Sequence, residues 1–525
     1  MSNSKCKFCP SIDREFYYES DESCKISNYV STYSGFCDCN LDCVLVSKDA
    51  GSSQSENIKQ GQKLGSMFSV VCSSEIDDNL EVLNVNTVSE DEPWTLNRIK
   101  REVKFSSDLT EIQTDSVHKM LSARSGVMSV NNDDIGHAAV TSHKIKLYDD
   151  TPIRIKPRHF PAPVAKQIED ECQRLLNLDV IEHSKSPFSS PVCPVFKPGK
   201  TMRLCIDYRK LNEVTVADRF PIPSLQDYIF GLYNRKFFTS LDLTSGFFQV
   251  PLEESSRPYT AFSTQHNHYQ FKRLSFGLKN CPSAFQREIQ AVLQDFGANI
   301  LVYIDDILIL SDSFEEHLDL VDRVMCTLDN HGIKIKMPKC RFFQDNIEFL
   351  GHQISRSGVR KSSKFIEQVR EFPRPTNVTE LRGFLGTVNF QRKFLPHCST
   401  LARPLSRLTG GSGKDKIIWN EELESSFVVL KEALIRDVEL SYPDYSPDAS
   451  KLELHVDASN LGAGATLSQI QNGVYVTIFH SSMSFSKTQC RYSTIEKELA
   501  SLRWAVKNLK CFLYKNGNRF GVDFH

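Results

Sequence analysis

The chain is 525 residues long, 40% hydrophobic and nearly neutral, with a formal net charge of −2 at pH 7. A single hydrophobic core stops growing at about 250–300 residues, so this length predicts several domains. No apolar run approaches the roughly 18 residues that cross a bilayer, and the first residues lack the apolar centre of a signal peptide; we expect an intracellular protein with no membrane partner.

Residues 1–135 are rich in Ser, Asn and Asp, show little periodicity and hold seven of the sixteen cysteines. This composition predicts a loosely folded leader of unknown role. Cys6 and Cys9 form a C-x-x-C pair, but the cysteines that follow do not complete a standard four-ligand zinc spacing. Unligated, reduced cysteines are therefore favoured over a zinc site, and a separate interaction role for the leader stays open.

The sequence pattern changes after the leader, and the pattern of residues 140–365 predicts a mixed α+β domain. Short β-type runs alternate with helical patterns there, without strict βαβ repetition. Residues 366–412 predict a small helical subdomain, and residues 413–449 a connection with one further helix. Residues 450–525 show three strand patterns and then a helix, which predicts a separate α/β domain.

Two adjacent aspartates, Asp305 and Asp306, interrupt the apolar run "ILVYIDDILIL". Burying an unpartnered carboxylate costs several kcal/mol or shifts its pKa, and neighbouring carboxylates repel each other. Successive residues of a strand point to opposite faces, so the chain must turn for both acids to reach one site. We predict a hairpin with the acids at its tip. Because no Gly or Asn supplies the turn, we also expect local strain.

A hard divalent cation is the simplest compensation for such a pair, and Mg²⁺ is bound through carboxylates together with substrate phosphates. A third acid should then lie upstream, and Asp242 in "FFTSLDLTSGFFQV" ends another apolar strand. Alone, Asp242 could equally be a turn or cap residue. With Asp305 and Asp306 it forms the set expected for two-metal phosphoryl transfer.

These motifs, with "FGLKNCPSAFQ" and "EFLGHQIS", make the chain from about His143 onward resemble the reverse transcriptases of gypsy-type LTR retrotransposons and, more distantly, of retroviruses. The resemblance implies a right-hand polymerase of fingers, palm and thumb, followed by an RNase H-like domain. It implies an RNA-directed DNA polymerase with two Mg²⁺ ions per active site, Mn²⁺ being the alternative. The implied partners are an RNA or DNA template with its primer, dNTPs and other Gag and Pol products. The implied location is the cytoplasm, in virus-like particles, or the nucleus.

The resemblance also assigns roles to individual residues. Asp242, Asp305 and Asp306 would be the polymerase metal ligands. The residues implied for the nucleotide pocket are Arg203 and Lys197 near the triphosphate, Phe247 as the gate against a ribose 2′-OH, and Phe276 with Gly277. Leu350 and Gly351 would lie in the primer grip. The basic segments between residues 334 and 394 would hold the nucleic-acid backbone without reading its sequence.

The last domain resembles RNase H, with Asp457 matching the first metal-binding acid and Glu498 the second. On the helical pattern Glu498 lies at the edge of an apolar stripe, whereas Glu496 points to solvent. The stripe consists of Ile495, Leu499, Leu502, Val506 and Leu509.

The chain departs from the family near its end. In "RFGVDFH", His525 stands where the third acid is expected, and Asp523 is displaced from that position. We therefore expect a truncated RNase H-like domain, an unpaired sheet edge and incomplete RNase H activity. No protease or integrase motif is present. The alternative to an active polymerase is a catalytically inactive, nucleic-acid-binding remnant of a retrotransposon polyprotein.

Overall fold

The computed structural model describes residues 92–103, 105–106, 108–196, 202–223 and 232–513, together with the backbone of four outlying strands. The chain divides into two compact units, Met1–Val88 and Ser89–His525. In the first unit, β1 (Phe16–Ser20) pairs antiparallel with β2 (Gly35–Cys37) on one side and β3 (Gly65–Ser69) on the other. Cys6 and Cys9, the C-x-x-C pair, lie outside the described residues.

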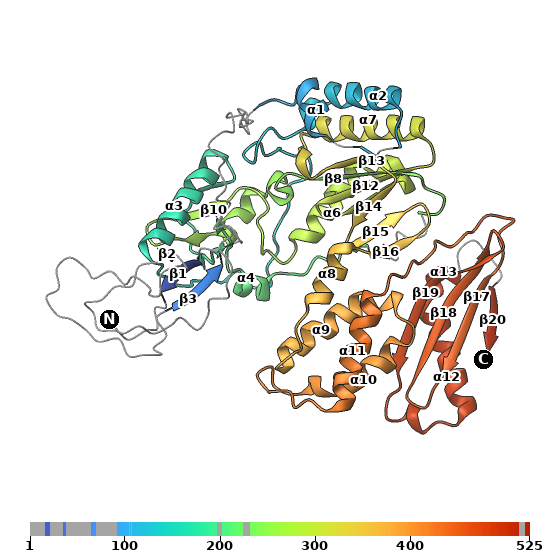
Figure 1. The fold of residues 1–525 in the computed structure, drawn as a ribbon. Helices are drawn as coiled ribbons and strands as arrows, with labels where there is room; N and C mark the ends of the chain where they lie inside the picture. The colour runs from blue at the N-terminus through green and yellow to red at the C-terminus, as the bar shows by residue number, and fades with distance from the viewer. Residues whose placement is uncertain are drawn as a thin grey trace. The chain divides into compact units, whose positions relative to one another are not determined.

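The second unit begins well before the expected leader boundary at residue 135. Helices α1 (Leu96–Glu102) and α2 (Glu111–Ala123) belong to it, and α2 packs against α7 (Phe314–Asn330) (Figure 1). The Arg124 guanidinium donates to both Asp322 carboxylate oxygens, at 2.7 and 2.9 Å. The segment after Ser89 is thus part of the folded second unit, and the prediction of a loose leader up to residue 135 was wrong for it.

The first sheet of this unit has the order β4-β10-β9-β5. It consists of β4 (Ile181–His183), β5 (Ser190–Pro191), β9 (Phe262–Ser263) and β10 (His268–Phe271). Nearby are α3 (Ala162–Asn177), the two-stranded ribbon of β6 (Val195–Phe196) with β7 (Met202–Arg203), and α4 (Arg209–Val214). Tyr208 is buried and donates to the Thr260 carbonyl at 2.8 Å, which ties the start of α4 to this sheet.

The central sheet carries the aspartates. It has the order β11-β12-β8-β13 and consists of β8 (Phe237–Asp242), β11 (Ile300–Tyr303), β12 (Asp306–Ser311) and β13 (Arg341–Gln344). Strand β12 is buried on both faces: Ile307 and Ile309 belong to one core, and Leu308 and Leu310 to another. A strand between two cores has no solvent face, which explains its unbroken apolar sequence.

Helices α6 (Cys281–Val292) and α7 pack against this sheet (Figure 1). His317 of α7 ties the helix to two strands: its ring nitrogens lie 2.8 Å from Thr239 Oγ1 on β8 and 2.9 Å from Ser311 Oγ on β12. The ring is fully buried. Burial lowers the pKa of His317 to about 3.

A three-stranded sheet follows, made of β14 (Asn346–Phe349), β15 (His352–Ser355) and β16 (Val359–Lys361). Helices α8 (Ser363–Glu371), α9 (Val378–Phe390), α10 (Cys398–Ser406) and α11 (Glu421–Ile435) come next. Residues of all four helices share one core. The sequence predicted that the helical subdomain ends at residue 412. Helix α11 lies beyond that boundary but shares the core of the other three helices, so it belongs to the same subdomain.

The last domain holds β17 (Leu452–Ala458), β18 (Gly462–Gln471), β19 (Val474–Ser484), α12 (Thr494–Asn508), α13 (Lys510–Leu513) and β20 (Phe520–Phe524). The sheet order is β19-β18-β17-β20, with β20 parallel to β17 (Figure 1). The predicted run of three strands and a helix is confirmed. The edge of β17 is paired by β20, so the sheet edges lie at β19 and β20.

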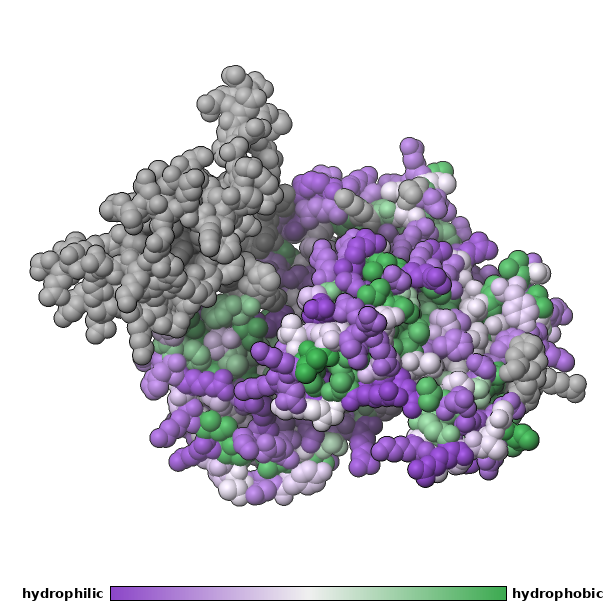
Figure 2. Space-filling view, turned by 60° about the horizontal axis from the view of Figure 1, so that its bottom comes forward, coloured by the Kyte–Doolittle hydropathy of each residue, from purple (hydrophilic) through white to green (hydrophobic). Residues whose placement is uncertain are grey.

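The described residues present a largely hydrophilic face in Figure 2, interrupted by small apolar patches. None of the described helices combines the length and apolar character needed to span a bilayer.

We expect acid to weaken the second unit through His317. Its pKa of about 3 in the folded chain lies below the unfolded value of 6.5, so the unfolding free energy falls as the pH drops below 6.5. For this group the loss is about 1.4 kcal/mol per pH unit. The melting temperature of the wild type should fall more steeply between pH 7 and pH 5 than that of His317→Asn. The exposed His266→Asn is the control and should keep the wild-type slope; equal slopes in all three proteins would contradict the assignment.

Candidate active site

The hairpin expected around the aspartates is present. Strand β11 ends at Tyr303, which pairs with Asp306 at the start of β12, so Ile304 and Asp305 form the turn. Ile304 adopts φ = 52°. A positive φ at the first turn residue matches the twist of a tight hairpin, but it is strained for a β-branched side chain. The predicted strain is therefore located at Ile304.

Gln286 of α6 holds this turn, and the sequence analysis missed it. Its side chain is fully buried. It donates to the Val302 carbonyl at 2.7 Å and accepts from the Ile304 amide at 2.7 Å. One amide thus bonds the backbone on both sides of Tyr303. The only sequence signal was a polar residue at a buried helix position.

The three aspartates come together at the ends of β8 and β12. Asp242 and Asp306 are register partners, so they lie directly opposite each other on adjacent strands. The Leu243 amide donates to the Asp305 carbonyl at 3.1 Å, which joins the turn to the end of β8. Asp305 Oδ1 is buried and has no hydrogen-bond partner. A Cβ on Gly246 would come within 2.3 Å of that oxygen, so the carboxylate fits only against glycine.

Two of the three aspartates have raised pKa values, because they are buried close to other negative charges. Burial, with Asp242 and then Asp306, raises the pKa of Asp305 to about 6. Burial, followed by Asp242, also raises the pKa of Asp306. Lys339 Nζ lies 3.0 and 3.2 Å from the two Asp242 oxygens and offsets part of this repulsion.

Three acids with an orphaned buried oxygen fit a divalent cation, whose oxygen ligands are commonly carboxylates. In the part of the chain that the structure describes, however, no three His, Cys, Asp or Glu side chains already form a metal-binding group. Coordination by all three aspartates would therefore require their side chains to reorient.

A cavity of about 320 Å³ opens beside these acids, and its lining includes Asp242, Asp306, Lys339 and Leu350. Leu350 and Gly351 form the turn between β14 and β15 and both have positive φ, 50° and 73°. The two residues predicted for the primer grip thus lie in the turn at this cavity.

A second group of predicted residues meets at an aromatic cluster. The Phe247 ring lies 4.9 Å from Phe276 and 5.4 Å from Phe285. The exposed Arg203 guanidinium lies over the Phe276 ring at 5.6 Å. Gly277, at φ = 89°, follows directly. Lys197 lies outside the described residues.

In the last domain, Asp457 on β17 and Glu498 on α12 are both exposed. The helix packs against β17 through Ser501, Ala505 and Leu509. Glu498 lies one turn before Ser501 and therefore on the face toward the sheet. Glu496 instead completes a capping box with Ser493, as expected of a residue outside the site.

Two further features of this domain concern the predicted apolar stripe on α12 and the end of β20. Ile495 and Leu499 are 69% and 59% exposed, so the predicted apolar stripe does not form the packing face at its N-terminal end. The register of β20 on β17 ends at Val456 with Phe524, one residue before Asp457, and Asp523 pairs with His455. His525 lies outside the described residues.

Comparisons with known proteins place these features in a family. One family model, described as reverse transcriptase (RNA-dependent DNA polymerase), matches residues 195–354, and an RNase H-like domain found in reverse transcriptase matches residues 419–522. The retrovirus-related Pol polyproteins of the Drosophila melanogaster transposons opus and gypsy are 36% and 33% identical over 399 and 433 residues. These alignments cover 73% and 78% of this chain but 40% and 41% of the relatives, so the chain spans about two fifths of their length.

Among solved structures, the foamy viral protease-reverse transcriptase in complex with double-stranded DNA matches with a TM-score of 0.73 and 23% identity. The match covers 82% of this chain and 89% of that chain. The same protein in complex with an RNA/DNA hybrid matches with a TM-score of 0.70. These matches establish the right-hand polymerase fold with an RNase H-like domain.

Asp305→Asn should stabilise the metal-free protein at neutral pH. Because the pKa of Asp305 is raised to about 6, the folded state disfavours the ionised form. The stability contributed by the protonated form is present below the unfolded pKa of 3.8 and is lost as the pH rises through 6. At pH 8 the unfolding free energy of the variant should exceed that of the wild type by about 1–3 kcal/mol, and the difference should vanish near pH 4.

Denaturant unfolding at both pH values measures this difference. Asp295→Asn, at an exposed aspartate, is the control and should leave stability unchanged at either pH. An Asp305→Asn protein no more stable than the wild type at pH 8 would contradict the assigned electrostatics.

Proposed function

The chain belongs to the retrovirus-related Pol family, with its reverse transcriptase and RNase H-like domains, and we propose that it acts as an RNA-directed DNA polymerase. The reaction is attack of a primer 3′-OH on the α-phosphorus of a dNTP, with pyrophosphate as the leaving group. The observation that carries this proposal is the convergence of Asp242, Asp305 and Asp306 at the ends of paired strands, with one buried carboxylate oxygen of Asp305 lacking a hydrogen-bond partner.

The three aspartates would hold two divalent cations, Mg²⁺ or Mn²⁺. When bound, the ions supply the charge that activates the attacking oxygen and stabilises the leaving oxygen. The chain's own contribution is to preorganise the ligands. Pairing of β8 with β12 sets Asp242 opposite Asp306, and Gln286 fixes the turn that carries Asp305. Lys339 must leave Asp242, at least in part, when a cation binds, because both occupy the same carboxylate.

The aromatic cluster supports a dNTP site. Arg203 is exposed and can bind phosphate oxygens through its guanidinium fork. Phe247 is only 9% exposed and is held by contacts with Phe276 and Phe285, so its ring cannot easily move aside. A rigid ring at the sugar position would exclude a 2′-hydroxyl by steric conflict.

An RNA or DNA template with its primer is the proposed macromolecular substrate. The matched foamy viral structures are complexes with double-stranded DNA and with an RNA/DNA hybrid, which supports this choice by analogy of fold. Leu350, which lines the cavity together with Asp242 and Asp306, and its neighbour Gly351 would hold the primer end there. The family also supports action inside the cell, in virus-like particles or in the nucleus, alongside other Gag and Pol products.

RNase H activity is a secondary proposal. Asp457 and Glu498 would be metal ligands there: Asp457 lies on β17, and α12, which carries Glu498, packs against that strand. Two-metal cleavage of an RNA/DNA hybrid would use both acids as ligands.

Substituting the hairpin acids should abolish DNA synthesis. On poly(rA)/oligo(dT) with Mg²⁺, Asp305→Asn and Asp306→Asn should each lower the extension rate by about 100-fold or more, since a charge needed in the transition state is lost. Asp295→Asn should retain wild-type activity. If the wild type shows no Mg²⁺-dependent extension but still binds the primer–template, the chain is the inactive nucleic-acid-binding remnant instead.

Phe247→Ala should relax sugar selection. The rate of ribonucleotide incorporation relative to deoxyribonucleotide should rise by about 10-fold or more, because the ring that blocks the 2′-OH is removed. Single-nucleotide extension with matched dNTP and rNTP measures the ratio. Phe248→Ala, the neighbouring ring, is the control, and an equal change in both variants would rule out a specific gate.

A further inference from the structure

We propose that Gln391 is a positioning residue for the Leu350–Gly351 turn and acts on it through His352. The effect of this coupling on DNA synthesis rests on the polymerase function proposed above. The coupling itself is a property of the folded chain, and contacts around the turn support it step by step.

The turn is held from within by His352. This residue pairs with Phe349 across the turn, and its Nδ1 lies 2.9 Å from the Leu350 carbonyl oxygen. A carbonyl can only accept, so Nδ1 carries the proton and donates. The other ring nitrogen, Nε2, then has a free lone pair and needs a donor.

No donor bonds Nε2 with normal hydrogen-bond geometry, although the Gln391 side chain lies close enough to offset part of the lowering of the His352 pKa by burial. Nε2 is buried and has no hydrogen-bond partner, and the same holds for both amide atoms of Gln391. His352 is 2% exposed and Gln391 is fully buried. Buried polar groups are almost always paired, directly or through an ordered water. The Gln391 amide is the group that can donate to Nε2 at one end and accept at the other.

The rings on either side of Gln391 in the sequence confirm that this segment lies against His352. The His352 ring is 5.4 Å from Phe390 and stacks on Phe394 at 5.8 Å. Phe390 also covers the turn, because a Cβ on Gly351 would lie 3.5 Å from its ring. The end of α9 therefore contacts both the histidine and the turn that it holds.

Burial keeps His352 neutral, and two buried lysines complete the cluster around it. Burial and nearby Lys393 lower the pKa of His352 to about 3. Lys361, the register partner of His352, donates to the Arg436 carbonyl at 2.6 Å, and both lysines lie within about 5.5 Å of the Phe394 ring. A neutral imidazole with Nδ1 protonated is the form that accepts from Gln391.

The contacts of Gln391 and His352 connect the helical subdomain to the candidate active site. Leu350 lines the cavity that contains Asp242 and Asp306. A displacement of α9 would be passed through Gln391 and His352 to Leu350, and so to the place where a primer end would lie. Truncating Gln391 should loosen the turn without touching the aspartates.

Hydrogen–deuterium exchange on the full chain without nucleic acid tests the coupling directly. In Gln391→Met, which keeps the length of the side chain, the amides of residues 349–352 should exchange about 10-fold faster, because the turn loses its buried anchor. Gln353→Met is the matched control: Gln353 is the next residue on β15 and its amide donates outward to Asn346 at 3.2 Å. The control should keep wild-type exchange at the turn.

Primer extension provides the functional arm. Gln391→Met should raise the KM for primer–template by about 10-fold and leave kcat within about 2-fold, because the chemistry is intact and only primer placement is weakened. Wild-type exchange at the turn in Gln391→Met, or faster exchange spread over α9 and β15 alike, would overturn the proposal. If the wild type does not extend primers, the proposed function fails, whereas the exchange experiment still decides the coupling.

Discussion

The structure around the candidate site depends on keeping three carboxylates together at the ends of β8 and β12, the two inner strands of the central sheet. Two of them, Asp242 and Asp306, are fixed by strand pairing, and the third lies on a turn whose first residue, Ile304, has an unfavourable φ. Burial and the neighbouring charges raise the pKa of Asp305 and of Asp306, which weakens the fold when these carboxylates are ionised. Three neighbouring residues offset this cost. Lys339 forms an ion pair with Asp242, Gln286 bonds the backbone of the turn, and Gly246 has no side chain to clash with Asp305.

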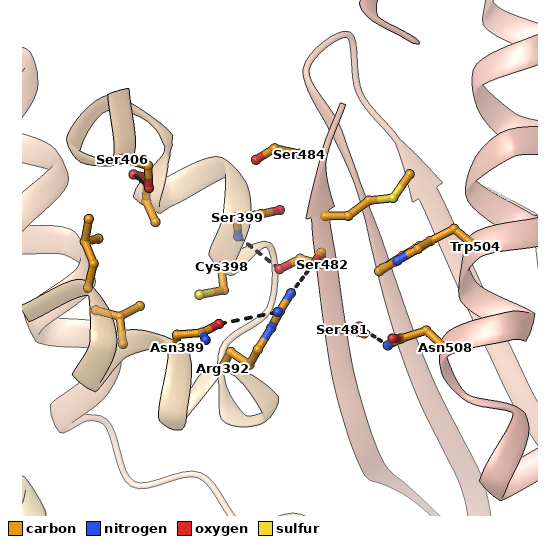
Figure 3. A pocket seen from close by; sticks show the side chains of 14 residues that line it. Asn389, Arg392, Cys398, Ser399, Ser406, Ser481, Ser482, Ser484, Trp504 and Asn508 are labelled. Atoms are coloured by element: carbon orange, nitrogen blue, oxygen red, sulfur yellow. Dashed lines mark hydrogen bonds between the residues drawn. The ribbon is translucent and has the colours of Figure 1, made fainter. Parts of the chain in front are cut away.

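The hydrophobic cores around this site offset the destabilisation caused by the buried carboxylates and the strained turn. Strand β12 lies between two hydrophobic cores, one shared with α6 and α7 and one continuing into the β17–β18 strands of the last domain. Packing on both faces fixes the register of β12, because a slip by one residue would exchange its two faces. The strained turn is held in place as a result. The helical subdomain has its own core, and it meets the last domain at a cavity of about 450 Å³ where Arg392 donates to the Ser482 carbonyl (Figure 3).

Much of this could be predicted from residue patterns, and the misses have physical causes. The hairpin was predictable because alternation forbids two adjacent strand residues from sharing a face. The boundary at residue 135 failed because composition says little about a segment stabilised by docking: α2 is weakly amphipathic and is held by α7 and by Arg124 with Asp322. The apolar stripe on α12 was wrong only at its N-terminal end, where Ile495 and Leu499 are exposed, whereas Leu502, Val506 and Leu509 pack in the core.

The sequence by itself indicated the chemistry: Asp242, Asp305 and Asp306 predicted a metal site, and the resemblance to reverse transcriptases implied roles for Arg203 and Phe247. Only the tertiary structure decided how those groups are held. Gln286 and Gly246 lie far along the chain from the groups that they contact, and nothing local distinguishes a buried amide that bonds a turn from one on the surface. Their roles depend on which strands and helices pack together, because a hydrogen bond or a close contact exists only at a distance that the fold sets.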